Sequence, residues 1–238
     1  MKVFNKEVWF GGQKIVDEFE RLHQPKDYCK MPSRESLAAM AFSASARRAV
    51  PLSVLCLGAA TKTEDQGSTP KCAAYSASSY AENVLWRKTG ELPTDIDPDA
   101  IYKYAKSVDG DPNGDGTTIP AVLEALGKLG YLPSSGRVRT IMSAFDVKAA
   151  VHRYGTCILG LNITNEWYKG NTEITSVTAR QVGGHAVQCV GYDGFGPWIQ
   201  NSWGAKWGRG GFAHLSWAAF ERQFMYGGFR EGVYDGMK

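Results

Sequence analysis

The pattern of the sequence changes at Gly155, and this change limits the possible folds more than any other feature. Before it, apolar residues recur at helical spacing between helix start and stop signals. After it come short, alternating runs of β-branched and aromatic residues separated by Gly and Asn, a pattern typical of antiparallel strands closing into a barrel-like sheet. The sequence therefore predicts an α+β fold. Its helical lobe would span about residues 50–146 and its β lobe about 147–238, with a site in the cleft between them.

Five helices are expected outside the N-terminal segment. They are predicted to run from Thr69 to Gly90, from Asp97 to about Val108, from Ile119 to Leu129, from Ala144 to Arg153 and from Ala218 to Phe224. The turn-rich stretch after Val108 partly matches an EF-hand loop, but the glutamate required at the twelfth position is missing. We therefore expect no calcium site there.

Composition and charge exclude several classes of protein. The chain has 238 residues, 43% of them hydrophobic, which is enough for a sizeable core. Its formal charge is +3 with scattered basic residues, so neither a nucleic-acid nor a membrane partner is expected, and the chain is expected to be a monomer. Neither a signal peptide nor a membrane-spanning run is recognisable, which favours a cytoplasmic location or signal-independent export.

The five cysteines lie far apart, at positions 29, 56, 72, 157 and 189. They form no CxxC motif and have no histidine at ligand spacing, so we expect neither a metal site nor a cofactor. An odd number of cysteines without a secretion signal indicates mostly reduced thiols, although one disulfide remains possible.

The first 49 residues differ from the rest of the chain. Apolar residues on one helical face predict a helix from Gln13 to Leu22, and a second short helix is expected from Glu35 to Ala46. This segment is too small to form its own core, so it is expected to dock on the main body, across or beside the cleft, or to be disordered. The pair Arg47 and Arg48 is either a processing site, as in a zymogen, or simply two solvated side chains.

The stretch DQGSTPKCAAYS places Cys72 in the first turn of a predicted helix, with Thr69 as N-cap and Pro70 at the first helical position. A thiol there experiences the positive end of the helix dipole, and Lys71 is adjacent, so both favour the nucleophilic thiolate. On its own, Cys72 is better explained as a small buried apolar residue. Its interpretation depends on partners elsewhere in the chain.

Three further residues have the chemistry that a nucleophilic cysteine requires. His185 is expected to begin a strand after two glycines, and Asn201 to end one. A histidine can take the thiol proton, and an asparagine amide can hold the imidazole ring in place. Gln66 can donate its side-chain amide, beside the Cys72 backbone N–H, to a developing oxyanion.

Gln66 to Ser76, GGHAVQCVGYD and IQNSWGAKWGRGGF resemble the signature segments of papain-family cysteine peptidases, over roughly residues 50–238. The resemblance implies that Cys72 is the nucleophile, His185 the imidazolium partner, Asn201 the orienting residue and Gln66 the oxyanion donor. It further implies that Trp203 shields the histidine–asparagine hydrogen bond and that Trp207 lines the leaving-group side of the cleft. The implied substrate walls are Gly116 and Thr117 on one side and Gly184 and Ala186 on the other.

The sequence departs from the family pattern at several points. Thr69 stands where a second cysteine usually precedes the nucleophile, so the disulfide next to the site is absent, and Ala73 replaces the usual tryptophan. The separation from Cys72 to His185 is also shorter than the roughly 130–150 residues usual in papain and cathepsin sequences. These departures suggest a trimmed relative whose site is held by helix capping.

The resulting functional hypothesis is an endopeptidase that hydrolyses peptide bonds through a Cys72 thioester. Two alternatives remain open at this point. An acyltransferase would resolve the same thioester with an amine, and a catalytically silent homologue would bind peptides as a scaffold module.

Overall fold

The computed structural model describes residues 9–10, 13–14, 29–41, 50–55, 62–91, 93 and 96–233. Near the N-terminus, β1 (Trp9–Phe10) pairs antiparallel with β2 (Gln13–Lys14). The predicted helix from Gln13 therefore does not begin there, and its remainder lies outside the described residues. The second helix, α2 (Arg34–Ala39), exists but ends before Met40, and the predicted extension to Ala46 lies largely outside the described residues, as do Arg47, Arg48 and Cys56.

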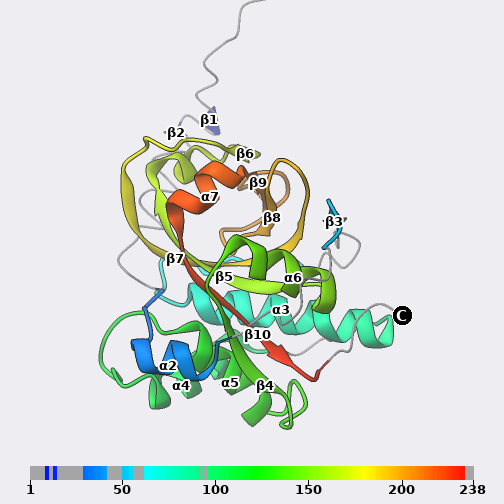
Figure 1. Ribbon diagram of the computed structural model, residues 1–238. Coiled ribbons are helices and arrows are strands. Elements are labelled where there is room, and N and C mark those ends of the chain that lie inside the picture. Colours follow the sequence, from blue (N-terminus) through cyan, green and yellow to red (C-terminus); the bar gives the residue numbers. More distant parts are fainter. Residues whose placement is uncertain are drawn as a thin grey trace, which may run out of the picture.

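Three helices form the first half of the main body: α3 (Cys72–Thr89), α4 (Pro98–Val108) and α5 (Ile119–Lys128). Their predicted end signals are mostly confirmed. Asp97 caps α4 by accepting the Asp99 N–H at 2.8 Å, and Gly90 ends α3 with a φ of 79°, which favours glycine. Figure 1 shows α2 at the same end of the molecule as α4 and α5.

The predicted start of α3 is wrong. The helix begins at Cys72 itself, and its N-cap is Lys71, which makes no side-chain cap hydrogen bond. The Thr69 hydroxyl instead donates to the Gln66 carbonyl at 2.7 Å, closing the preceding turn. The loop from Gln66 to Lys71, called the nucleophile loop because Cys72 is the predicted nucleophile, is therefore held by a hydrogen bond within the loop and not by helix capping.

One sheet forms the second half of the molecule, in the order β4-β10-β5-β7-β8-β9-β6, with β3 (Val54–Leu55) also paired to β7. All its pairings are antiparallel except that of β6 with β9. Its strands are β4 (Arg137–Ile141), β5 (Cys157–Thr164), β6 (Glu173–Ile174), β7 (Gln181–Tyr192), β8 (Pro197–Gln200), β9 (Phe212–Leu215) and β10 (Phe224–Glu231). The elements between strands are α6 (Ala144–Tyr154), η2 (Asn165–Lys169) and α7 (Trp217–Gln223).

Strands β4 and β10, which are neighbours at one end of the sheet, were not anticipated from the sequence. β10 contains Gly227 and Gly228, which weaken a strand pattern. The reason for Gly228 is close packing, because a Cβ there would lie 2.9 Å from atoms of both Ile119 and Leu123 on α5. β4 precedes the predicted lobe boundary near residue 146, yet it pairs with β10 in the same sheet.

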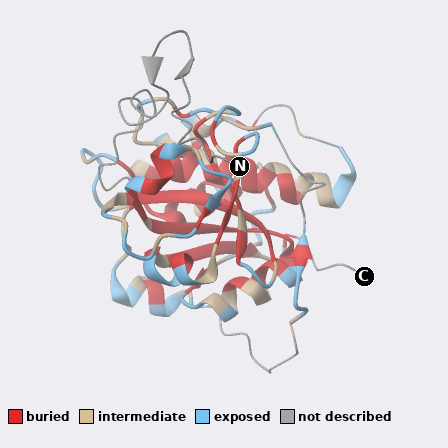
Figure 2. Ribbon diagram, turned by 90° about the horizontal axis from the view of Figure 1, so that it is seen from above, coloured by how far each residue is buried: buried red, intermediate tan, exposed pale blue. Residues whose placement is uncertain are grey.

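Helix α3 positions the site because it packs on the centre of the sheet. Its buried face is built from small residues, including Ala73, Ala77 and Ala81, which let its backbone approach β7. The Ser76 hydroxyl donates to the Ala186 carbonyl at 2.9 Å and fixes this contact. Figure 2 shows the strands in the middle of the molecule as buried. Cys72 at the start of α3 and Ala186 on β7 are both fully buried.

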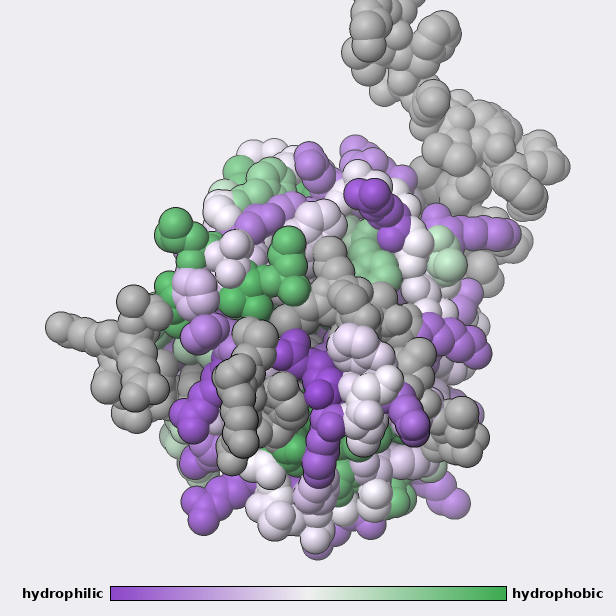
Figure 3. All heavy atoms as spheres, turned by 90° about the vertical axis from the view of Figure 1, so that its right-hand side faces the viewer, coloured by the Kyte–Doolittle hydropathy of each residue, from purple (hydrophilic) through white to green (hydrophobic). Residues whose placement is uncertain are grey.

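Two features are absent from the described part of the chain. No helix there combines the length and hydropathy needed to cross a bilayer. Nor do three or more His, Cys, Asp or Glu side chains gather there in a way that would hold a metal ion. On the face drawn in Figure 3, hydrophilic residues are interspersed with neutral and hydrophobic ones.

Candidate active site

His185 and Asn201 meet inside the sheet. His185 lies within β7, five residues into the strand and not at its start as the sequence suggested, and Asn201 follows β8 directly. His185 Nε2 lies 2.8 Å from Asn201 Oδ1, and both residues are almost fully buried. The two neighbouring strands thus bring together the predicted base and its orienting amide.

The surrounding hydrogen bonds assign the histidine tautomer. The Ser202 backbone N–H donates to Asn201 Oδ1 at 2.8 Å, which identifies that atom as the amide oxygen. Because an amide oxygen only accepts, His185 Nε2 must carry the hydrogen that it donates. In a neutral ring, Nδ1 is then the unprotonated nitrogen, as a general base requires.

Aromatic rings enclose this pair. Trp203 lies with its ring centroid 4.9 Å from that of His185, and Tyr168 stacks on Trp203 at 5.7 Å. The ring centroid of Trp167 lies 6.0 Å from that of His185, and the two rings pack edge to face. Trp203 is only 2% exposed, so these rings keep water from the histidine–asparagine hydrogen bond.

Gln66 is tied to Asn201 through Ser202. The Ser202 hydroxyl donates to Gln66 Oε1 at 2.7 Å, and the Gln66 N–H donates to the Ser202 carbonyl at 2.9 Å. Gln66 Nε2 donates to the Thr69 carbonyl at 2.9 Å, which uses one of its two hydrogens. The carboxamide is thus fixed on the nucleophile loop with a second N–H available for a ligand.

Cys72 lies where α3 meets β7. Burial raises the pKa of its thiol from 9.0 to about 12, opposed mainly by a backbone hydrogen bond from Ala186, the residue after His185. This is opposite to the expected lowering by the helix dipole and Lys71. The Lys71 ammonium instead pairs with the Asp99 carboxylate at 2.8 Å. Because the thiol is fully buried, desolvation has the largest effect on its pKa.

The thiol is buried because the N-terminal segment lies in the predicted cleft. The Cys29 N–H donates to the Gly184 carbonyl at 3.3 Å, and the Lys30 N–H donates to the Thr117 carbonyl at 3.1 Å. Cys29 and Thr117 form a parallel bridge. The segment therefore spans from one predicted substrate wall to the other, next to His185.

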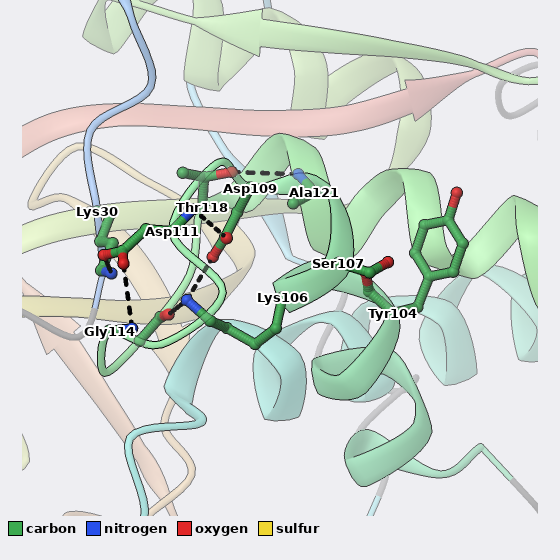
Figure 4. Close-up of polar contacts among 10 residues, drawn as sticks. Lys30, Tyr104, Lys106, Ser107, Asp109, Asp111, Gly114, Thr118 and Ala121 are labelled. Carbon is green, nitrogen blue, oxygen red and sulfur yellow. Dashed lines mark hydrogen bonds and ion pairs between the residues drawn. The ribbon is translucent and has the colours of Figure 1, made fainter.

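The turn-rich loop after α4 anchors this segment, as Figure 4 shows. The Lys30 ammonium pairs with the Asp111 carboxylate, and Asp111 also accepts the Gly114 N–H at 3.1 Å. Lys106 braces the loop by donating to Asp109 at 2.8 Å and to the Gly116 carbonyl at 3.0 Å. A stretch that partly resembled a calcium loop thus holds the N-terminal segment through an ion pair.

The remaining predicted substrate residues have different surroundings. Gly116 has a φ of 72° and directs its carbonyl to Lys106, so it shapes the loop next to Thr117. Trp207 does not line an open surface: it is fully buried, stacks on Trp167 and donates to the Trp167 carbonyl at 2.8 Å. It supports the aromatic layer behind His185.

Sequence reasoning missed several residues of the site. Ser202 sits within the recognised NSW motif, so its position was available but its link to Gln66 was not. Trp167 and Tyr168 come from a segment distant in sequence, and Cys29 from a stretch predicted as loop. No local pattern marks them, because tertiary packing alone brings them to the site.

Comparisons with known proteins agree with this geometry. The family model described as "Papain family cysteine protease" matches residues 131–223, which include His185 and Asn201. Among curated proteins, "Cathepsin B-like CP3" of Giardia intestinalis is 28% identical over 162 residues, covering 64% of this chain and 42% of that protein. "Probable cysteine protease RD19D" of Arabidopsis thaliana is 26% identical over 199 residues, covering 66% of this chain and 54% of that protein. The chain spans about half the length of these relatives.

Solved structures share the fold. Xylellain, a cysteine protease from Xylella fastidiosa, superposes with a TM-score of 0.63 at 19% identity, covering 90% of this chain and 96% of that one. Digestive procathepsin L 3 of Tenebrio molitor larval midgut superposes with a TM-score of 0.67 at 18% sequence identity. The match covers 93% of this chain and 80% of that one. The predicted papain-like α+β fold is confirmed, and residues 131–223 of the chain are similar to the papain family of cysteine proteases.

Proposed function

We propose that the chain is a cysteine endopeptidase with Cys72 as nucleophile, His185 as acid and base, Asn201 as the residue that orients His185, and Gln66 in the oxyanion hole. The observation that carries the proposal is the hydrogen-bonded chain from His185 through Asn201 and Ser202 to Gln66, next to the buried end of α3. A histidine oriented by an amide, with an amide donor beside it, serves catalysis only if a nucleophile lies next to them.

The reaction follows from the donors and acceptors. His185 Nδ1 takes the Cys72 proton, and the sulfur attacks a peptide carbonyl to form a tetrahedral intermediate. The second N–H of Gln66 and the Cys72 backbone N–H stabilise its oxyanion. His185 then protonates the leaving amine, the thioester forms, and water activated by His185 hydrolyses it to the acid.

Peptide segments of proteins are the proposed substrates, since the cleft already accommodates one. The Cys29–Lys30 backbone bonds to Gly184 and Thr117 in the manner of an added strand, a mode that recognises any extended peptide. Residues 1–49 are therefore proposed to act as an extension that blocks the cleft of the peptidase domain at residues 50–238. Activity requires this segment to leave or to be cleaved.

The test is hydrolysis of a denatured protein substrate by the chain after removal of residues 1–49, compared with Cys72→Ala and Asn201→Ala prepared in the same form. Cleavage should disappear in Cys72→Ala and fall in Asn201→Ala, because removing an orienting group leaves the nucleophile in place. Product masses with and without an added amine distinguish hydrolysis from acyl transfer. Equal cleavage by the parent chain and Cys72→Ala would overturn the proposal.

A further inference from the structure

A cavity separate from the candidate active site lies where the N-terminal segment meets α4, α5, β4 and β10. Its volume is about 710 Å³, and its wall includes Ser36 and Met40 from the N-terminal segment, Ala121 from α5 and Val138 from β4. None of the four proposed catalytic residues belongs to this wall. Figure 1 shows α2, α4, α5 and β4 together at one end of the molecule. A cavity of this size accommodates a small organic molecule.

Arg230 on β10 contributes a buried cation to the wall of this cavity. The residue is only 3% exposed. Its guanidinium lies between two glycines that also line the cavity, because a Cβ on Gly127 would lie 2.7 Å from Arg230 Cζ and a Cβ on Gly136 would lie 3.2 Å from Arg230 Nε. The missing side chains of these glycines therefore provide the space that the guanidinium occupies.

The charge of Arg230 is not balanced by an acidic side chain. Nη1 donates to the Leu123 carbonyl at 2.9 Å, and Nη2 donates to the carbonyls of Pro133 at 2.9 Å and Ser134 at 3.5 Å. Among the described residues, no carboxylate forms an ion pair with Arg230, and its Nε has no hydrogen-bond partner. A guanidinium stays protonated in proteins, and a buried charge is costly unless it is paired. This part of the wall therefore favours an anionic group.

Two more cationic side chains line the same cavity. Lys128 at the end of α5 and Arg137 at the start of β4 are both exposed, so they lie where the cavity opens to solvent. No carboxylate in the described part of the chain forms an ion pair with either of them. Together with Arg230, they offer several N–H donors to one oxoanion.

The acidic side chains of the cavity offset this charge only in part. Asp109 is already paired with Lys106 at 2.8 Å. Glu124 accepts the Tyr104 hydroxyl at 3.2 Å and has no cationic partner among the described residues. Three cationic side chains thus face one anionic side chain that is not neutralised, and the cavity has an excess of positive charge.

We propose that this cavity binds a small organic molecule carrying an oxoanion, a phosphate or a carboxylate group. Arg230 binds the oxoanion inside the cavity, and Lys128 and Arg137 bind it from the opening. Met40 and Ala121 pack against the uncharged part of the molecule. The proposal is independent of the proposed peptidase function, because it uses none of the proposed catalytic residues.

The first experiment measures binding by isothermal titration calorimetry at low salt. It uses the full chain with Cys72→Ala, which removes the proposed nucleophile and keeps the N-terminal wall of the cavity attached. The probes are phenyl phosphate, benzoate and the uncharged benzyl alcohol. We expect both anions to bind more tightly than benzyl alcohol, and the tighter anion identifies the preferred oxoanion. Binding of benzyl alcohol as tight as that of the anions, or no binding of any probe, would overturn the proposal.

The second experiment tests the residues that bind the oxoanion. Arg230→Met should weaken binding of the tighter anion about 10- to 150-fold, the range expected for hydrogen bonds to a charged group. Arg137→Ala should weaken it about 2- to 5-fold, because an exposed charge contributes less. Lys88→Ala is the control and should change nothing, since Lys88 is an exposed lysine on α3 that does not line the cavity. Equal affinity of Arg230→Met and its parent contradicts the assignment.

A third experiment decides the question if Arg230→Met does not fold. Glu124→Gln removes the unneutralised negative charge of the cavity, so it should tighten binding of the anion about 2- to 5-fold. The side-chain Nε–H signal of Arg230 in the NMR spectrum should also shift and exchange more slowly with water when the anion is bound. An unchanged affinity in Glu124→Gln together with an unshifted Arg230 signal would place the anion elsewhere and refute the proposal.

Discussion

Gly184→Ala should drive the N-terminal segment out of the cleft. A Cβ at position 184 would lie 2.7 Å from the Cys29 carbonyl oxygen and 3.5 Å from the Cys29 nitrogen. Gly184 does not have a left-handed backbone, so the substitution acts through this contact and not through strain. Because the contact is with main chain, no side-chain rotation relieves it.

The size of this effect can be estimated from the hydrogen bonds that hold the N-terminal segment in the cleft. Hydrogen bonds from Cys29 to Gly184, from Lys30 to Thr117 and from Tyr226 to Lys30 stabilise it, each contributing about 1 kcal/mol. Overpacking costs about 1–3 kcal/mol, which is comparable to that sum. The open fraction of the segment should therefore rise about 5- to 150-fold.

The assay is the rate at which iodoacetamide alkylates Cys29, measured by peptide mass spectrometry in a Cys72→Ala background. The rate should rise with the open fraction. Gly194→Ala is the control, because a Cβ there meets nothing within 4 Å. A Cys29 thiol as protected in Gly184→Ala as in the parent would refute the placement of the segment.

Three further predictions concern the groups around the site. Burial raises the pKa of Glu64 from 4.5 to about 7, so the native state favours the protonated acid. The free energy of unfolding should therefore fall as pH rises from about 4.5 to about 7, because the unfolded chain loses this proton first. Glu64→Gln should remove that dependence and be more stable above pH 7 by roughly 3 kcal/mol at most, as measured by urea unfolding across pH. Ser202→Ala leaves Gln66 Oε1 without its 2.7 Å donor, so kcat/KM should fall about 5- to 100-fold with a modest loss of Tm; an unchanged kcat/KM contradicts the oxyanion role. Because burial raises the pKa of Cys72 to about 12, its alkylation in the covered chain should be slow at neutral pH and accelerate up to that pH; fast labelling at pH 7 argues against the covered state.

Much of the fold could be predicted from the sequence because its signals are local. Asp97 before Pro98, and Gly90 after an apolar helical run, each act within one turn, and the structure has helix ends at both. The nucleophile loop was harder, since Thr69 has the chemistry of an N-cap but uses its hydroxyl on Gln66. Local propensity does not distinguish these two uses.

The site could be predicted only as a set of residue types. The motifs around Cys72, His185 and Asn201 identified candidate groups, but the direction of the Cys72 pKa depends on burial by a segment more than 40 positions earlier in the chain. The hydrogen bond from Tyr226 to the Lys30 carbonyl likewise depends on strand register between β5 and β10. Neither contact leaves a periodic signal in the sequence.

The most direct test of the central claim is to trap the thioester. The full chain and Gly184→Ala are mixed with an activated acyl ester, quenched in acid, digested and analysed by mass spectrometry. We expect one acyl group on Cys72, more of it in Gly184→Ala, and none at that position in Cys72→Ala. Turnover of the ester by Cys72→Ala at the parent rate, or acylation at another residue alone, would contradict it.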